Sequence, residues 1–214
     1  MNLPIVLKDT IYKSRHVIRT IIPEKIIKLY FPSVRDSKLE LSFSNKYKTH
    51  LSTYDYRIYD FWNSYQKEPQ LVLSFANKLI ERFDFQDFDH IHKLYYTQQD
   101  QNIRAAIFLL MNRCGNHLDF FKDSFNLKNA TEFRSLMESI AFVPTLPVLY
   151  ENPFSHFRKS RSFIIFDMPR AFYKNKISVV GDTSFSQQQL FDTLARNTNW
   201  CLMTAANDKT KSAM

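Results

Sequence analysis

The stretch Ser162-Phe-Ile-Ile-Phe-Asp-Met-Pro-Arg170 decides the fold class of this chain. From Ser162 to Phe166 it is a continuous apolar run, bounded by charge and by Pro169, as in a parallel strand that is buried on both faces. Short apolar segments of the same kind occur at Val148 to Tyr150 and at Trp200 to Thr204. Since helical patterns alternate with these strands, the sequence predicts an α/β fold with a mostly parallel sheet and helices on both faces.

Helical spacing of apolar residues marks the remainder of the chain. The segments predicted to be helical are residues 11–30, 56–65, 69–83, 103–111, 130–139 and 185–196. Residues 38–53 alternate in part and predict one or two short strands, whereas residues 83–92 predict a loop or short turn. We therefore expect an α/β core formed by residues 1–83 and 146–214, with a helical insertion at residues 84–145.

The composition is that of one compact domain, because 44% of the 214 residues are hydrophobic and 15% are aromatic. No apolar run approaches the roughly 20 residues of a membrane helix, and the first 30 residues lack the apolar region of a signal peptide. We expect no membrane partner and a cytoplasmic location. Cys114 and Cys201 are predicted to be structural thiols, and because His90 and His92 lack metal-ligand spacing we predict no metal.

Charge and glycine content carry more information than the other composition values. The formal net charge of +8 favours polyanionic partners such as nucleic acid. The chain has only 2 glycines, Gly115 and Gly181, where average usage would give roughly 15. A site that depends on a glycine-rich loop is therefore not expected. The abundance of Lys, Asn, Phe and Tyr is consistent with an AT-rich, fast-evolving genome such as that of a phage or parasite.

Five segments, in order along the chain, resemble Dam-like DNA adenine methyltransferases. The stretch 162–170 resembles the family's apolar strand that runs into Asp-Pro-Pro-Tyr. The other four segments are Ile58-Tyr-Asp-Phe-Trp62, Arg104-Ala-Ala-Ile-Phe-Leu-Leu-Met-Asn-Arg113, Phe185-Ser-Gln-Gln-Gln-Leu-Phe-Asp-Thr-Leu194 and Trp200-Cys-Leu-Met-Thr-Ala-Ala-Asn-Asp208. The resemblance implies a Rossmann-like methyltransferase sheet in which residues 84–145 correspond to the target-recognition region. Because the family continues beyond the Asn207-Asp208 strand end, we expect an abbreviated fold or a fragment.

The resemblance also implies a cradle for S-adenosylmethionine, which this chain lacks. The family has Phe-x-Gly-x-Gly after its first strand, since glycine lets the main chain approach the methionine moiety and take positive φ. The corresponding stretch, Tyr30-Phe-Pro-Ser-Val-Arg-Asp-Ser-Lys38, contains no glycine, and Lys13-Ser-Arg15 is the nearest substitute for an expected Gly-Gly-Lys. Phe31, Ser33 and Asp55 are the candidate cofactor positions, and we expect them to be vestigial.

Half of the catalytic motif is retained. By the resemblance, Asp167 can accept a hydrogen bond from an adenine amine, and Pro169 is kept. Met168 replaces the first proline, and Arg170 replaces the tyrosine that stacks on the flipped base, with Phe166 or Phe172 as alternative platforms. Arginine can stack on a base or hold a phosphate, so this change is compatible with contact to nucleic acid.

Basic residues interleaved with aromatic ones suggest a surface that follows phosphates. The run His156-Phe-Arg-Lys-Ser-Arg161 precedes the Asp167 strand, and the insertion contributes Lys93, Arg104, Arg113 and Lys122. The candidate nucleic-acid contacts are Arg113, Arg158, Lys159, Arg161 and Arg170. A solvated loop is the alternative for residues 156–161, and an ordinary core helix with a solvated end is the alternative for residues 104–113.

Three functions are compatible with these features. The first is a catalytically degenerate methyltransferase-like protein, retained for binding DNA or as a scaffold or partner subunit, with no cofactor. The second is an active divergent adenine methyltransferase that uses S-adenosylmethionine and Asp167. The third is a structural viral or phage particle protein built on this fold, located in the host cytoplasm or the virion.

Overall fold

The computed structural model describes residues 4, 14–32, 34, 37–53, 55–82, 88–115, 131–133, 135, 137, 148–150, 162–168, 192, 194–196 and 199–204. At positions 88, 167–168 and 202–204 only the main chain is described. The chain divides into two compact units. The helical unit consists of residues 1–8 and 57–147, and the sheet unit consists of residues 9–56 and 148–214.

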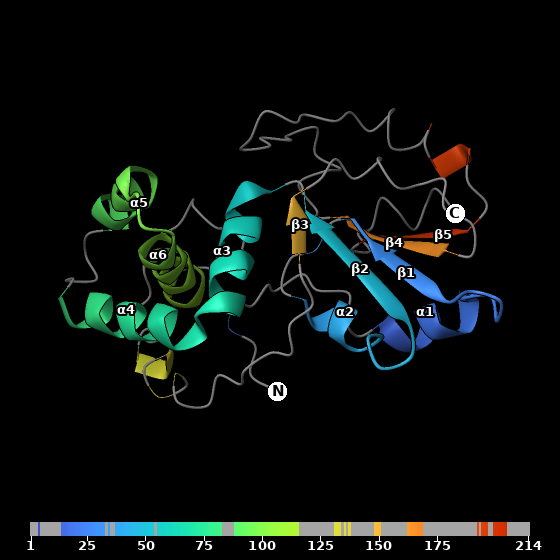
Figure 1. The fold of residues 1–214 in the computed structure, drawn as a ribbon, viewed down its shortest axis with the longest axis horizontal. Coiled ribbons are helices and arrows are strands. Elements are labelled where there is room, and N and C mark those ends of the chain that lie inside the picture. The colour runs from blue at the N-terminus through green and yellow to red at the C-terminus, as the bar shows by residue number, and fades with distance from the viewer. Residues whose placement is uncertain are drawn as a thin grey trace. The chain divides into compact units, whose positions relative to one another are not determined.

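The sheet unit contains five parallel strands in the order β3-β2-β1-β4-β5 (Figure 1). Their bounds are β1 (Lys28–Phe31), β2 (Lys48–Thr53), β3 (Val148–Tyr150), β4 (Ser162–Met168) and β5 (Trp200–Thr204). The strand order reverses between β1 and β4, as in doubly wound nucleotide-binding folds. The predicted α/β class with a parallel sheet is confirmed, and the architecture is compatible with a Rossmann-like fold.

Helices flank this sheet. α1 (Arg15–Ile21) and α2 (Lys38–Leu41) lie on one side of it, and helical residues 192 and 194–195 lie on the other (Figure 1). Arg19 joins α1 to the segment after α2, because its guanidinium donates to the Ser42 carbonyl oxygen at 2.9 Å and lies 5.5 Å from the centre of the Phe43 ring. These contacts hold α1 against the segment that follows α2.

Two sequence predictions in the sheet unit were wrong. Residues 28–30 were expected to extend a helix, but they form β1, because so short a segment with a few apolar residues cannot be assigned to helix or strand by periodicity. Residues 38–41 were expected in a strand, but they form α2. There, Leu39 and Phe43 are buried and Leu41 is only half-buried, so the spacing that matters is four residues rather than two.

The helical unit is built around one central helix. Its helices are α3 (Tyr56–Lys67), α4 (Pro69–Arg82), α5 (Phe88–Thr97) and α6 (Gln101–Cys114), and helical main chain recurs at 131–133, 135 and 137. Every side chain from Ala105 to Met111 of α6 is buried, which is the pattern of a helix surrounded by protein. Asp100 caps α6 by accepting hydrogen bonds from the N–H groups of Asn102 and Ile103 at 2.8 and 3.0 Å.

The helical unit is larger than the insertion expected at residues 84–145, because it also takes in residues 57–83. The helices predicted at 56–65, 69–83 and 103–111 are confirmed as α3, α4 and α6. The loop predicted at residues 83–92 is wrong for 88–92, which begin α5. In α5, buried Ile91 and Tyr95 are one helical turn apart, and this spacing was masked by the acidic residues before it.

Candidate ligand site at the switch point of the sheet

The carboxyl ends of β1 and β4 form the place where an open parallel sheet of this order usually binds a ligand. β1 ends at Phe31, Asp167 is the penultimate residue of β4, and Asp55 follows β2 directly after residue 54. Three of the five positions predicted from sequence for cofactor and catalysis therefore lie at one edge of one sheet, and the other two, Ser33 and Pro169, lie outside the described residues. At Asp167 the main chain pairs with Met203 of β5.

Phe31 packs inward at this edge. Its side chain is buried and its ring lies 6.2 Å from that of Phe43, centre to centre. Phe43 in turn contacts the Tyr47 ring at 6.3 Å and carries the Arg19 guanidinium. Phe31 therefore belongs to the hydrophobic core between the sheet and the first two helices.

The segment after β1 is fastened to the end of β2. The N–H of Val34 donates a hydrogen bond of 3.0 Å to the carbonyl oxygen of Ser52, and the Val34 side chain is 0% exposed. A cofactor cradle needs main-chain N–H groups that face the ligand and a backbone without side chains in the way. At Val34 the N–H is already used by Ser52 and the side chain is buried, so this residue offers a ligand neither a free N–H nor an open backbone.

Ser37 takes the backbone conformation that usually requires glycine. Its φ is 60° and its ψ is 9°, and among the described non-glycine residues no other has positive φ. The Ser37 carbonyl oxygen accepts from the N–H of Leu41, so the left-handed turn leads directly into α2. A side chain in this region costs of order 1 to 3 kcal/mol unless the surroundings enforce it. The surroundings of Ser37 therefore enforce a turn that glycine would take without this cost.

Asp55 keeps the place of an acidic residue after the second strand. Its N–H donates to the Oγ1 of buried Thr53 at 3.1 Å, which fixes the turn from β2 into α3. The Asp55 side chain is half-buried. A carboxylate here suits a ribose hydroxyl in Rossmann-like sites, but without a fitting loop after β1 it is only one part of such a site.

The described residues cover the catalytic and nucleic-acid predictions only in part. The Phe166 ring is fully buried, so it cannot serve as an open platform for a base. The positions Ser33, Arg158, Lys159, Arg161, Pro169, Arg170 and Phe172 lie outside the described residues, as do the side chains of Asp167 and Met168. Their predicted roles stay predictions.

Arg113 stands at the end of α6 inside the helical unit. Its Nε donates to the carbonyl oxygen of Pro4 at 2.7 Å, which joins Pro4 to the end of α6. Burial lowers the pKa of Arg113, and the neighbouring Cys114 and Tyr65 oppose that shift. The predicted contact of Arg113 with nucleic acid stays a prediction.

Arg104 is engaged within the helical unit. Its Nε and Nη2 donate to the two carboxylate oxygens of Asp60 at 2.6 and 2.9 Å, and Asp60 is 1% exposed. Its Nη1 also donates to the Gln98 carbonyl oxygen at 3.2 Å. This bidentate pair joins α3 to α6, so the expectation that Arg104 belongs to a phosphate-tracking surface was wrong. The signal in the sequence was Asp60 itself, a carboxylate on the apolar face of a helix.

Tyr65 lies near Arg113 and has a buried polar group. Within the described part of the chain its hydroxyl has no hydrogen-bond partner. Burial raises the pKa of Tyr65 to about 12, and the positive charge of Arg113 opposes that rise. The ring stacks on Phe61 at 5.4 Å with an interplanar angle of 20°, so Tyr65 is a core residue rather than a reactive one.

The remaining candidate groups add no reactive centre. Cys114 and Cys201 are buried free thiols, as predicted for structural cysteines, and burial raises the pKa of Cys201. Among the residues whose placement is known, no three His, Cys, Asp or Glu side chains are grouped as a metal site would need. No described helix is both long and apolar enough to cross a membrane. A scan against protein-family models finds no match, and a search of curated proteins finds none either.

Proposed function

We propose that this chain is a catalytically degenerate relative of DNA adenine methyltransferases that binds nucleic acid without transferring a methyl group. One observation carries the proposal. In a parallel sheet whose order reverses between β1 and β4, the loop at the reversal is tied to β2 by the Val34–Ser52 hydrogen bond and carries a buried side chain. A methyl donor needs that position open.

Charge supports the nucleic-acid part of the proposal. The chain has a formal net charge of +8, and a surplus of this size attracts the phosphate backbone irrespective of base sequence. Contacts to phosphate position a protein on nucleic acid, whereas contacts to bases specify the sequence. We therefore expect binding with weak sequence preference.

The experiment has two arms. Calorimetry with S-adenosylmethionine should give no binding heat, and fluorescence anisotropy with a labelled DNA duplex should show binding that weakens as salt is raised. Heat of binding from the methyl donor would overturn the degenerate assignment. Absence of duplex binding at low salt would overturn the nucleic-acid assignment while leaving the first arm intact.

A methylation assay separates this proposal from an active enzyme. The wild-type protein should incorporate no labelled methyl group into DNA, and Asp167→Ala should bind the duplex as tightly as wild type. Methyl incorporation that Asp167→Ala abolishes would establish the active alternative instead.

A further inference from the structure

The amino ends of β1 and β2 carry four lysines, Lys25, Lys28, Lys46 and Lys48, which we call the amino-edge lysines. Lys28 and Lys48 are register partners in the parallel β1–β2 pair. Neighbouring strands lie about 4.8 Å apart, and paired residues of parallel strands project on the same face. Lys25 and Lys46 lie in the turns that lead into these strands, and all four side chains are exposed.

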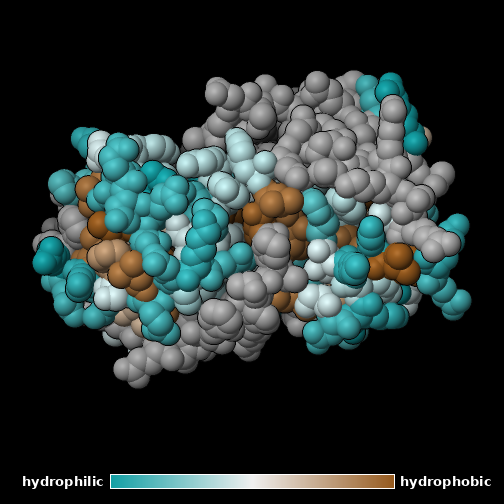
Figure 2. All heavy atoms as spheres, in the orientation of Figure 1, coloured by the Kyte–Doolittle hydropathy of each residue, from teal (hydrophilic) through white to brown (hydrophobic). Residues whose placement is uncertain are grey.

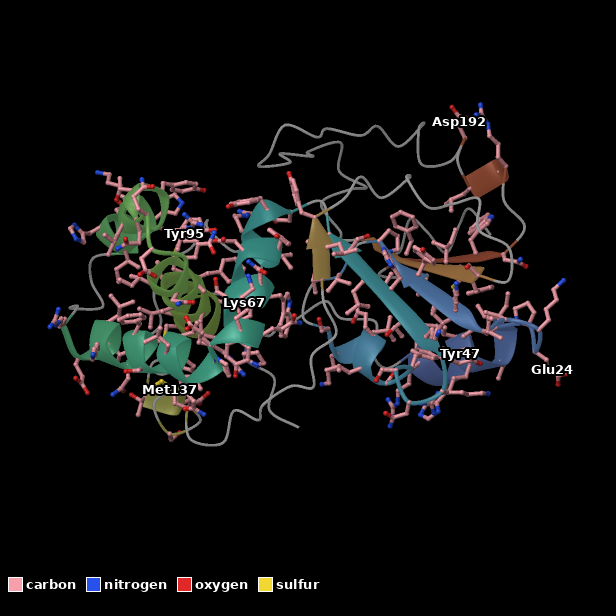
Figure 3. All side chains as sticks on the ribbon, viewed as in Figure 1. Glu24, Tyr47, Lys67, Tyr95, Met137 and Asp192 are labelled. Carbon is pink, nitrogen blue, oxygen red and sulfur yellow. The ribbon has the colours of Figure 1, made fainter. Side chains whose placement is uncertain are left out.

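The described residues do not neutralise the amino-edge lysines. Within the described residues none of the four forms an ion pair, and Lys46 instead contacts the Tyr47 ring at 5.3 Å. The acidic residue nearest in sequence is the exposed Glu24. Figure 3 shows Glu24 and Tyr47 at this end of the sheet. Like charges at neighbouring strand positions destabilise a sheet, so these lysines favour an external anion.

The residues around the amino-edge lysines distinguish between two anionic partners, a lipid surface and a line of phosphates. Ile27, between Lys25 and Lys28, is 52% exposed, and apolar and hydrophilic atoms alternate on this unit's surface (Figure 2). A lipid surface usually needs an amphipathic helix with a broad apolar face. The helix at this edge, α1, exposes Val17 and Ile21, but with 7 residues it is too short to present such a face. Several point charges on a sheet edge suit a line of phosphates better.

We propose that the amino-edge lysines bind the phosphate backbone of DNA, on the sheet edge opposite to Asp167. This inference rests on the proposed nucleic-acid binding and gives it a place. β4 has 7 residues and leads from one edge to the other, a distance of about 20 Å at the usual rise per residue. DNA held at the amino edge does not bring a base to Asp167, so binding here serves a purpose other than methyl transfer.

The test compares two quadruple variants of the whole chain. One changes all four amino-edge lysines to Gln. The control changes four exposed basic residues of the helical unit to Gln, namely Lys67, Lys78, Arg82 and Lys93. Four positive charges are removed from +8 in each case, so both variants have a formal net charge of +4. Circular dichroism and thermal melting verify that both are folded.

Anisotropy titrations with a labelled duplex should show at least about tenfold weaker binding for the amino-edge variant than for the control. The slope of log affinity against log salt should fall by about 0.9 for each lysine that contacts a phosphate. Equal loss in the two variants would overturn the inference, because net charge alone would then explain it. Wild-type binding that the amino-edge variant retains in full would overturn the inference and leave the proposed function standing.

Two further outcomes identify different failures. A wild-type protein that binds no duplex at all would remove the proposed function together with the inference. Binding of the wild-type protein to vesicles of anionic phospholipid but not to DNA, lost in the amino-edge variant and kept in the control, would assign the amino-edge lysines to a lipid surface and overturn the DNA assignment.

Discussion

The N–H of Val34 donates to the carbonyl oxygen of Ser52 at 3.0 Å, and this bond joins the loop after β1 to the penultimate residue of β2. The two residues belong to segments that are separated by α2 and the start of β2. Together with the complete burial of Val34, the bond holds the start of the loop after β1 on the β2 side of that strand, next to the switch point between β1 and β4.

Val34→Ala tests how tightly this loop is packed. Removing two buried methyl groups should lower the free energy of unfolding by about 2 kcal/mol, from lost transfer energy and from the cavity left behind. Urea denaturation followed by circular dichroism measures the change. The matched control is Val17→Ala in the same unit, since Val17 is 61% exposed and should change stability by less than about 0.5 kcal/mol. If both substitutions are equally harmless, the loop does not fill the switch point.

Ser37→Gly tests the strain at the left-handed turn. Glycine takes a φ of 60° without a steric cost, so this variant should be more stable by a few tenths to about 1 kcal/mol. Ser42→Gly is the control, because Ser42 has a φ of −69° and its Oγ donates to the Leu39 carbonyl oxygen. That substitution should destabilise the sheet unit. Destabilisation by both would show that Ser37 is not strained.

Asp60→Ala tests the ion pair between α3 and α6. The change leaves the Arg104 guanidinium half-buried without its carboxylate, which should cost about 3 to 5 kcal/mol of unfolding free energy. The double variant Asp60→Leu with Arg104→Met removes both charges and should recover most of that loss. Glu81→Ala provides a comparison, because its carboxylate accepts from Asn77 at an exposed site. If the double variant is as unstable as Asp60→Ala, the loss of stability does not come from an Arg104 charge left without its partner.

Tyr65→Phe tests the buried hydroxyl and its titration. Since that hydroxyl has no hydrogen-bond partner among the described residues, removing it should leave stability unchanged or raise it by about 1 kcal/mol. The folded-state pKa of about 12 exceeds the ordinary value of 10.0, so the unfolded chain loses its proton first as pH rises. The contribution of the raised Tyr65 pKa to the free energy of unfolding is complete below pH 10 and is lost between pH 10 and about 12.

Stability measured across that pH range should therefore fall less steeply in Tyr65→Phe than in wild type. Tyr96→Phe is the control for the loss of one hydroxyl, because Tyr96 is 53% exposed. Identical slopes in wild type and Tyr65→Phe would mean that Tyr65 titrates as it does in the unfolded chain.

Local patterns predicted the elements that are long or bounded by strong signals. The apolar run of β4 with Pro169 behind it, and the periodic helices α3, α4 and α6, have the positions expected from sequence. Short segments were harder, because β1 and α2 have four residues each and two periods fit so few positions equally well. At the candidate site, the missing glycines were evident from sequence, whereas the inward packing of Phe31 on Phe43 was not.

The sequence by itself determined that the chain has buried parallel strands, a surplus of positive charge and no glycine-rich loop, because these depend on residue types and their local spacing. Only the tertiary structure decided the strand order, the Val34–Ser52 bond, the capture of Arg104 by Asp60 and the pairing of Lys28 with Lys48. The physical reason is that each of these joins segments remote in sequence. Which remote groups meet depends on how all the elements pack together to bury their apolar faces.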